Sequence, residues 1–116
     1  MKIDSIRKYC LSLPYATENV QWGADLVFKV GGKMFTVVGL ETVPAQFSLK
    51  CTPEEFAELI EQEGISPAHY AARYHWVTIA GPDVLEAKEV KRLIQKSYEL
   101  VWEKLTQKVR KGLQAG

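Results

Sequence analysis

Six side chains in this 116-residue sequence could together bind a phosphate-bearing polymer. They are Lys29, Lys33, Lys50, Arg73, His75 and Trp76. Lysine and arginine side chains contact phosphate oxygens, and an aromatic ring offers a surface on which a base can stack. We expect Lys29, Lys50 and Trp76 to form the centre of such a surface and the other side chains to lie near its rim.

Strand patterns position the three central residues on one face of a sheet. Residues 47–51 alternate apolar and polar side chains, the period of two that a strand shows when one face meets the core. In residues 26–30 the same period places Leu26, Phe28 and Val30 inward and Val27 and Lys29 outward. Lys29 and Lys50 fall on the polar side of these runs. In the last predicted strand Trp76 points to that side too. The sequence therefore predicts an open sheet face that is both basic and aromatic.

Short β-branched and aromatic runs predict an antiparallel meander. The runs are residues 17–22, 26–30, 33–40 and 46–51. Gly31-Gly32 separates the second run from the third, and a two-residue hairpin turn needs the positive φ that glycine adopts without strain. The third run leaves open which of its sides faces the core, because both sides carry apolar residues. Lys33 begins that run and can turn into solvent.

A strong junction follows the fourth strand. Thr52 stands where an N-cap belongs, Pro53 at the first helical position, and Glu55 three residues after Thr52 can complete a capping box. We expect a helix from Thr52 to Glu63, a short helical turn over residues 65–68, and then a further strand that contains Trp76.

Helices are predicted at both ends of the chain. Residues 4–13 place apolar side chains at three-and-four spacing, and a longer apolar stripe runs from about residue 87 to about residue 110. These two helices would cover one face of the sheet. The predicted fold is a single α+β domain, residues 1–116, with an antiparallel sheet of about five strands.

The charge distribution is more informative than the net charge of +1. Residues 1–50 carry six basic and four acidic side chains, residues 51–87 one and seven, and residues 88–116 eight and three. The sequence has no hydrophobic signal region or long apolar run, so we expect a cytoplasmic protein that does not enter a membrane. The near-neutral total argues against avid, indiscriminate polyanion binding.

The residues that could support catalysis do not form a recognised active-site pattern. Candidate groups are His69, His75, Ser48, Ser97 and Cys51. Cys10 and Cys51 are far apart, fall at positions patterned as core, and lack the spacing of a metal or redox motif. Acidic residues along residues 54–61 have no converging histidine, so we interpret them as a solvated helix face. We predict no enzyme activity, no metal and no cofactor.

Four segments together resemble the MmcQ/YjbR family. They are FKVGGKMF at 28–35, SLKCTPE at 48–54, HWVT at 75–78 and SYELV at 97–101. The resemblance covers essentially the whole chain. It implies a frataxin-like fold and a DNA-binding role through a double-wing arrangement. Iron binding, which a frataxin-like topology could also suggest, is not expected, because residues 4–9 contain one acid and two bases.

Two functions from different classes follow from these patterns. The first is DNA binding through the basic and aromatic sheet face. No helix rich in Arg, Asn and Gln is available to read base edges, so we expect binding to be largely independent of sequence. The alternative is a protein-interaction module, in which the acidic middle and the basic C-terminal helix dock a partner or a second copy as a weak homo-oligomer.

Overall fold

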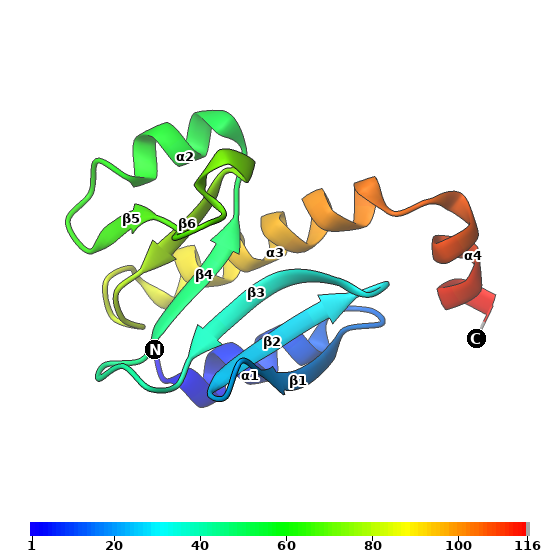
Figure 1. Cartoon of the computed structure of the whole chain (residues 1–116), viewed down its shortest axis with the longest axis horizontal. Helices are drawn as coiled ribbons and strands as arrows, with labels where there is room; N and C mark the ends of the chain where they lie inside the picture. Colours follow the sequence, from blue (N-terminus) through cyan, green and yellow to red (C-terminus); the bar gives the residue numbers. More distant parts are fainter. Residues whose placement is uncertain (116) are drawn as a thin grey trace.

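The computed structural model describes residues 1–115 and contains a six-stranded antiparallel sheet with order β1-β2-β3-β4-β6-β5 (Figure 1). The strands are β1 Thr17–Gln21, β2 Asp25–Val30, β3 Lys33–Gly39, β4 Gln46–Lys50, β5 Ile65–Pro67 and β6 Trp76–Ile79. The helices are α1 Ile3–Ser12, α2 Pro53–Leu59, α3 Ala87–Lys104 and α4 Gln107–Ala115, with a short 3-10 helix η1 at Ala72–Tyr74. The predicted α+β class and antiparallel sheet are confirmed.

Helices α1 and α3 cover one face of the sheet (Figure 1). The apolar stripe of α3 packs on β3 and β4, and Leu93 and Ile94 are completely buried there. Phe28, Phe47 and Leu49 meet them from the strands and are equally buried. The alternation predicted for the second and fourth strands therefore points the expected side chains into the core. Val27, predicted to face outward, is nevertheless completely buried.

The Gly31-Gly32 turn is present as predicted. Val30 and Lys33 are the last partners of the β2–β3 hairpin, and the two glycines between them have φ of 57° and 80°. Glycine adopts these left-handed angles without the steric cost that other residues bear. The turn fixes the register of the two strands and so places Lys33 at the end of the sheet.

A β-bulge in β3 explains why the alternation of that strand is ambiguous. Phe28 pairs with Thr36 and Lys29 pairs with Met34, so Phe35 is an extra residue without a partner on β2. Phe35 and Thr36 are consecutive and both completely buried. The bulge turns Met34 onto the face that carries Lys29.

The prediction of one C-terminal helix from about residue 87 to about residue 110 is wrong, because this segment forms two helices, α3 and α4. Leu105 has extended backbone angles that end α3. Thr106 then caps α4, because its hydroxyl accepts a hydrogen bond from the N–H of Val109 at 3.2 Å. The apolar spacing continues across the break, so the pattern alone does not reveal it.

The helical turn predicted for residues 65–68 is wrong. This segment begins with β5, whose Ile65 pairs with Ile79 and whose Pro67 pairs with Val77. Proline is tolerated because β5 is an edge strand. The sheet of residues 1–115 therefore has six strands instead of about five.

The capped junction before α2 is confirmed, with two differences. Thr52 accepts a hydrogen bond from the N–H of Glu55 at 3.2 Å. The Glu55 carboxylate binds Arg92 instead of returning to the cap, and α2 ends at Leu59, before Glu63. Among the helices of residues 1–115, none combines the length and the apolar character needed to cross a bilayer.

Candidate functional site

Strands β3 and β4 part at one end, and Ser97 of α3 joins them there. Their ladder extends to the pair Thr36 and Leu49, and the next pair would be Phe35 and Lys50. Instead, the buried Ser97 hydroxyl accepts a hydrogen bond from the Lys50 N–H at 2.9 Å and donates one to the Phe35 C=O at 2.6 Å. One side chain thus satisfies both backbone groups. Beyond this point the strands diverge (Figure 1).

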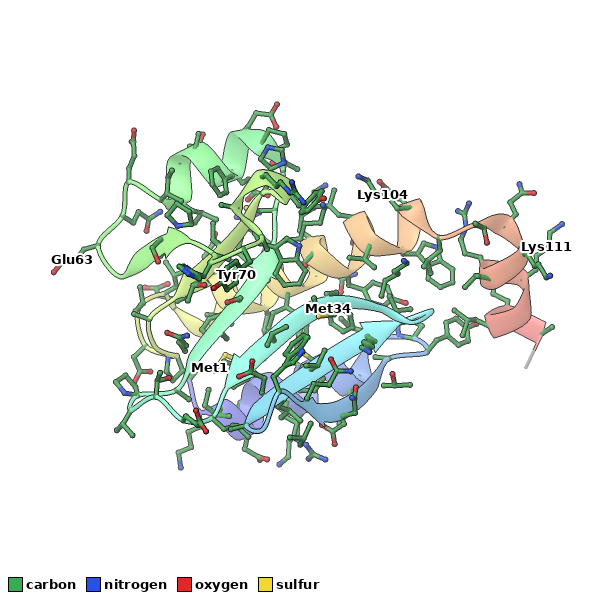
Figure 2. All side chains as sticks on the ribbon, in the orientation of Figure 1. Met1, Met34, Glu63, Tyr70, Lys104 and Lys111 are labelled. Carbon is green, nitrogen blue, oxygen red and sulfur yellow. The ribbon has the colours of Figure 1, made fainter. Side chains whose placement is uncertain are left out.

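A cleft of about 540 Å³ lies where the strands diverge. Three lysines line it: Lys33 from the start of β3, Lys50 from the end of β4 and Lys104 from the end of α3. The remaining lining is apolar or aromatic and consists of Met34, Tyr74, Trp76 and Val101. Figure 2 labels Met34 and Lys104, which come from the two sides of the cleft.

The three lysines have no acidic partner. Within residues 1–115, no carboxylate lines the cleft and no ion pair involves any of the three. Like charges that converge without a counter-ion repel one another, so bringing the three ammonium groups together does not by itself stabilise the folded chain. The arrangement would favour a bound anion.

Lys50 is the most constrained of the three. Its Nζ donates a hydrogen bond to the Tyr74 C=O at 3.1 Å and lies 6.0 Å from the centre of the Tyr74 ring. Burial lowers the pKa of Lys50, and the nearby charge of Lys104 lowers this pKa further. A phosphate bound in the cleft would raise the pKa of Lys50, because its negative charge favours the protonated amine.

Five of the six residues predicted from the sequence gather in or beside the cleft. Lys33, Lys50 and Trp76 line it. Arg73 lies next to it, because its guanidinium packs over the half-exposed Tyr74 ring at 4.9 Å. Lys29 stands in register with a cleft residue of β3 and therefore shares its face of the sheet.

Two details of the predicted surface are wrong. Trp76 is on the expected face, opposite Lys50, but only 8% of it is exposed, so it is a wall of the cleft and not an open stacking platform. His75 does not join the others. It has a left-handed backbone with φ 64°, and its ring packs edge-on against Phe56 of α2 with centroids 5.6 Å apart. Its carbonyl also accepts a hydrogen bond from the Cys51 N–H.

Sequence reasoning missed the cleft residues Tyr74, Met34, Val101 and Lys104. Met34 was not predicted, because the bulge in β3 changes the face of the sheet to which its side chain points. Val101 was assigned to the apolar stripe of the last helix, and Lys104 to the basic residues that suit the end of a helix. Tyr74 beside Arg73 was the one readable signal, since an exposed aromatic next to a cation is common at binding surfaces.

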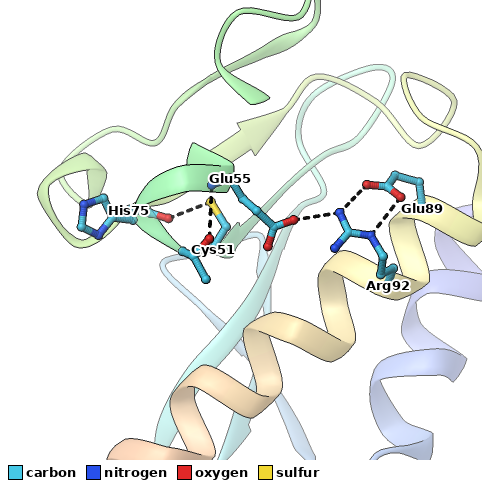
Figure 3. A network of polar contacts seen from close by, with 6 residues as sticks. Cys51, Glu55, His75, Glu89 and Arg92 are labelled. Carbon is cyan, nitrogen blue, oxygen red and sulfur yellow. Dashed lines mark hydrogen bonds and ion pairs between the residues drawn. The ribbon is translucent and has the colours of Figure 1, made fainter. Parts of the chain in front are cut away.

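A second cluster of charged side chains, at the corner between α2 and α3, contains acidic and basic residues that pair with one another. Arg92 binds Glu55 of α2 at 2.8 Å and Glu89 of its own helix at 2.6 Å (Figure 3). The hydrogen bonds that Arg92 donates to both carboxylates raise the pKa of Arg92, and its hydrogen bonds to Glu89 lower the pKa of Glu89. Arg92 lies in the basic C-terminal part of the sequence, but its charge is paired with these two carboxylates.

The candidate nucleophiles are occupied or buried. Burial raises the pKa of Cys10 to about 12 and that of Cys51 to about 11, which confirms their prediction as core thiols. The Ser48 hydroxyl is hydrogen-bonded to the Thr78 hydroxyl at 2.9 Å. In the part of the chain that the structure describes, no three His, Cys, Asp or Glu side chains converge as a metal site would require.

The comparison with known proteins identifies the family to which this chain belongs. The family model described as YjbR matches residues 11–100 of the chain. The chain therefore belongs to the YjbR family. The matched region runs from the end of α1 through most of α3 and contains strands β1 to β6.

Individual relatives agree with this assignment. The chain is 31% identical to the Escherichia coli K12 "uncharacterized protein YjbR", over 97% of this chain and 98% of that protein. It is 26% identical to the Escherichia coli O157:H7 "uncharacterized protein YbdF", over 97% and 94%.

Solved structures share the fold. A crystal structure of the Deinococcus radiodurans protein DR2400, with a DUF419 domain, matches with a TM-score of 0.87 at 31% identity, over 97% of this chain and 88% of that one. A Pseudomonas syringae protein matches in fold with a TM-score of 0.70 at 24% identity, over 87% and 99%.

Proposed function

We propose that this protein binds nucleic acid without catalysing a reaction on it, and that the lysine-lined cleft is the centre of the binding surface. The observation that carries this proposal is the convergence of Lys33, Lys50 and Lys104 on an apolar cleft that offers them no carboxylate. A phosphodiester backbone supplies the missing negative charge, and neutralising phosphates is the main source of affinity in such complexes.

Binding is largely independent of sequence in this proposal. Lysine contacts a phosphate as a point charge and does not distinguish bases. Of the two aromatic residues that line the cleft, Tyr74 has enough exposure, 52%, to stack on a base, and stacking tolerates every base. The preference for DNA comes from the double-wing role that the family resemblance implies. The cytoplasmic location predicted from the sequence stays a prediction.

The absence of catalysis is supported by the state of the candidate groups. The Ser97 hydroxyl is committed to two backbone hydrogen bonds, and the Cys51 thiol donates to the His75 carbonyl and has a raised pKa. Neither group is available as a nucleophile beside a base.

Fluorescence anisotropy of labelled single-stranded and duplex DNA tests the proposal. We expect Lys50→Gln/Lys104→Gln to weaken binding by about tenfold per lost contact, because a charge-assisted hydrogen bond contributes about 1.5 kcal/mol or more. The slope of log affinity against log salt should fall in magnitude by about 1.4 for single strands. Trp76 is left intact, because truncating a buried tryptophan costs about 3 kcal/mol of stability or more.

The matched control is Lys2→Gln/Lys88→Gln, which removes the same charge from two exposed lysines without ion pairs in residues 1–115. Equal affinity of the two double variants would contradict the cleft as the binding centre. Absence of any binding at low salt would contradict nucleic-acid binding itself.

A second candidate function, protein interaction, is favoured by the acidic edge at α2. Glu54, Glu58, Glu61 and Glu63 are all exposed and lack ion pairs among the described residues. A basic partner or a second copy of this chain would complement them. If this function is the correct one, Glu58→Gln/Glu61→Gln removes partner binding or self-association, whereas changes in the cleft leave it intact.

A further inference from the structure

A second basic pocket lies at the joint between α3 and α4. It has a volume of about 230 Å³ and is lined by Trp102, Gln107, Arg110, Lys111 and Gln114. We propose that this pocket is a phosphate subsite that binds the nucleic-acid backbone beyond the cleft. The proposal rests on the proposed function, and it adds a contact outside residues 11–100, the region that the family model matches.

The lining residues of α4 form one face of that helix. Positions 107, 110, 111 and 114 follow three-and-four spacing, so their side chains lie on the same side. This face presents one guanidinium, one ammonium and two amides, all of which can donate hydrogen bonds to phosphate oxygens. The set suits a phosphate more closely than it suits a base or an apolar ligand.

The apolar side of α4 is used for docking on the protein. Val109 and Leu105 lie so close to Gly31 that a Cβ built there would be 2.9 Å and 2.8 Å from their methyl carbons, and Leu113 packs against the core cluster. The β2–β3 turn thus needs glycine at position 31 both for its positive φ and for this approach. This side of α4 is only partly covered, since Val109 is still 37% exposed.

The aromatic wall of the pocket is fixed in place. Trp102 stacks on Tyr98 with an interplanar angle of 12° and on Tyr15 with an angle of 14°. The Tyr98 hydroxyl donates a hydrogen bond to the Pro14 carbonyl at 2.6 Å, which anchors the stack to the end of α1. This wall of the pocket is therefore in place before any ligand binds, which reduces the entropy cost of binding.

The cations around the pocket form no ion pair with any residue of 1–115. Residues 104–115 contain four cations, Lys104, Lys108, Arg110 and Lys111, and no acid. Arg110 Nε is buried and has no hydrogen-bond partner within residues 1–115. A buried donor without a partner is costly, and an anion in the pocket would supply the acceptor.

The subsite would continue the cleft. Val101 and Lys104 line the cleft, and Trp102 lines the pocket, so one turn of α3 contributes to both. Figure 2 shows Lys104 and Lys111 on the part of the molecule where α3 passes into α4. A strand bound in the cleft therefore has a second basic contact next to it.

Anisotropy with oligonucleotides of two lengths tests the subsite on the full chain. We expect Arg110→Gln/Lys111→Gln to bind a single strand of about sixteen nucleotides about tenfold more weakly than wild type, while a strand of about four nucleotides, which fills the cleft alone, binds equally well. The control is again Lys2→Gln/Lys88→Gln. If the variant and the control bind the long strand equally, the subsite proposal is overturned while the function of the cleft stands.

Titration with inorganic phosphate, followed by the amide and arginine Nε–H resonances of the labelled full chain, separates the two proposals. Shifts of residues 107–114 that disappear in Arg110→Gln/Lys111→Gln support the phosphate subsite even if nucleic-acid binding fails. Unchanged resonances overturn it. Binding to vesicles of anionic and neutral lipid that is lost in the variant, with no response to phosphate, would assign the basic face to a membrane surface and also overturn it.

Discussion

The cleft and the α2–α3 corner both contain several charged side chains, but the corner pairs opposite charges, whereas the cleft brings like charges together. At the corner, Arg92 lies between Glu55 and Glu89, so each charge has its partner inside the protein. In the cleft, Lys50 and Lys104 repel each other, and burial lowers the pKa of Lys50. The corner connects α2 to α3, whereas the lysine charges of the cleft have no carboxylate partner within residues 1–115.

This difference separates charge that supports the fold from charge that is available to a ligand. A basic residue count cannot make the distinction, because Arg92 and Lys104 lie on the same helix and look alike in the sequence. What distinguishes them is the carboxylate supplied by a neighbouring element. Strained or repulsive groups that persist in a fold are candidates for function.

The largest effect should come from removing the hydroxyl that joins the cleft strands. Ser97→Ala leaves the Lys50 N–H and the Phe35 C=O without their partner, in a position that is completely buried. We expect the free energy of unfolding to fall by about 2 kcal/mol, measured by urea denaturation. The comparison variant is Ser48→Ala, whose hydroxyl bonds another hydroxyl on the partly buried face, and its loss should be about 1 kcal/mol or less. Similar losses in both would contradict the bridging role of Ser97.

A substitution of Arg92 at the α2–α3 corner tests whether a cation that is already neutralised contributes to DNA affinity. Arg92→Gln removes a cation from the same helix as Lys104 but one that is already neutralised. Because this arginine is half exposed, we expect a loss of stability of only about 0.5–1 kcal/mol and unchanged affinity for DNA. Affinity that falls as far as in Lys50→Gln/Lys104→Gln would mean that general positive charge, and not the cleft, carries binding.

The smallest effect concerns pH. Since the pKa of Lys50 is lowered in the folded chain, its amine loses its proton at a lower pH than an ordinary lysine, and DNA affinity should begin to fall there as pH rises. The pH dependence of stability has the opposite sign. The unfolded chain binds this proton more tightly, so the free energy of unfolding increases as pH rises from the lowered pKa to the ordinary one. Lys50→Arg keeps its charge and should remove the early decline in affinity, measured by anisotropy at alkaline pH. An identical pH profile in both proteins would exclude Lys50 as the source.

Much of the fold could be predicted from local sequence signals. The Gly31-Gly32 turn and the Thr52 cap each depend on a few neighbouring residues, and both are present in the structure. Two signals were misread for the same reason. The serine and proline of β5 resemble a helix start, and the apolar stripe of α3 continues past Thr106, so only the tertiary pairing and the cap geometry decide these cases.

The candidate site was harder to predict because it is built from distant segments. Lys50, Tyr74 and Lys104 meet only because β3 and β4 part at Ser97 and because η1 returns the chain to the start of β6. Alternation correctly assigned the face of Trp76, but it carries no information on what covers that face. Burial depends on neighbours that a strand pattern does not specify.

The most direct test of the central claim is to map backbone amide shifts while a short single-stranded DNA is titrated into the labelled protein. If the cleft is the binding centre, the largest shifts occur at Lys33 and Met34, at Lys50, at Tyr74 and at Lys104, and the Trp76 indole responds with them. The corner around Arg92 should remain unchanged. Shifts confined to α2 and its acidic edge, or none at all at low salt, would contradict the claim.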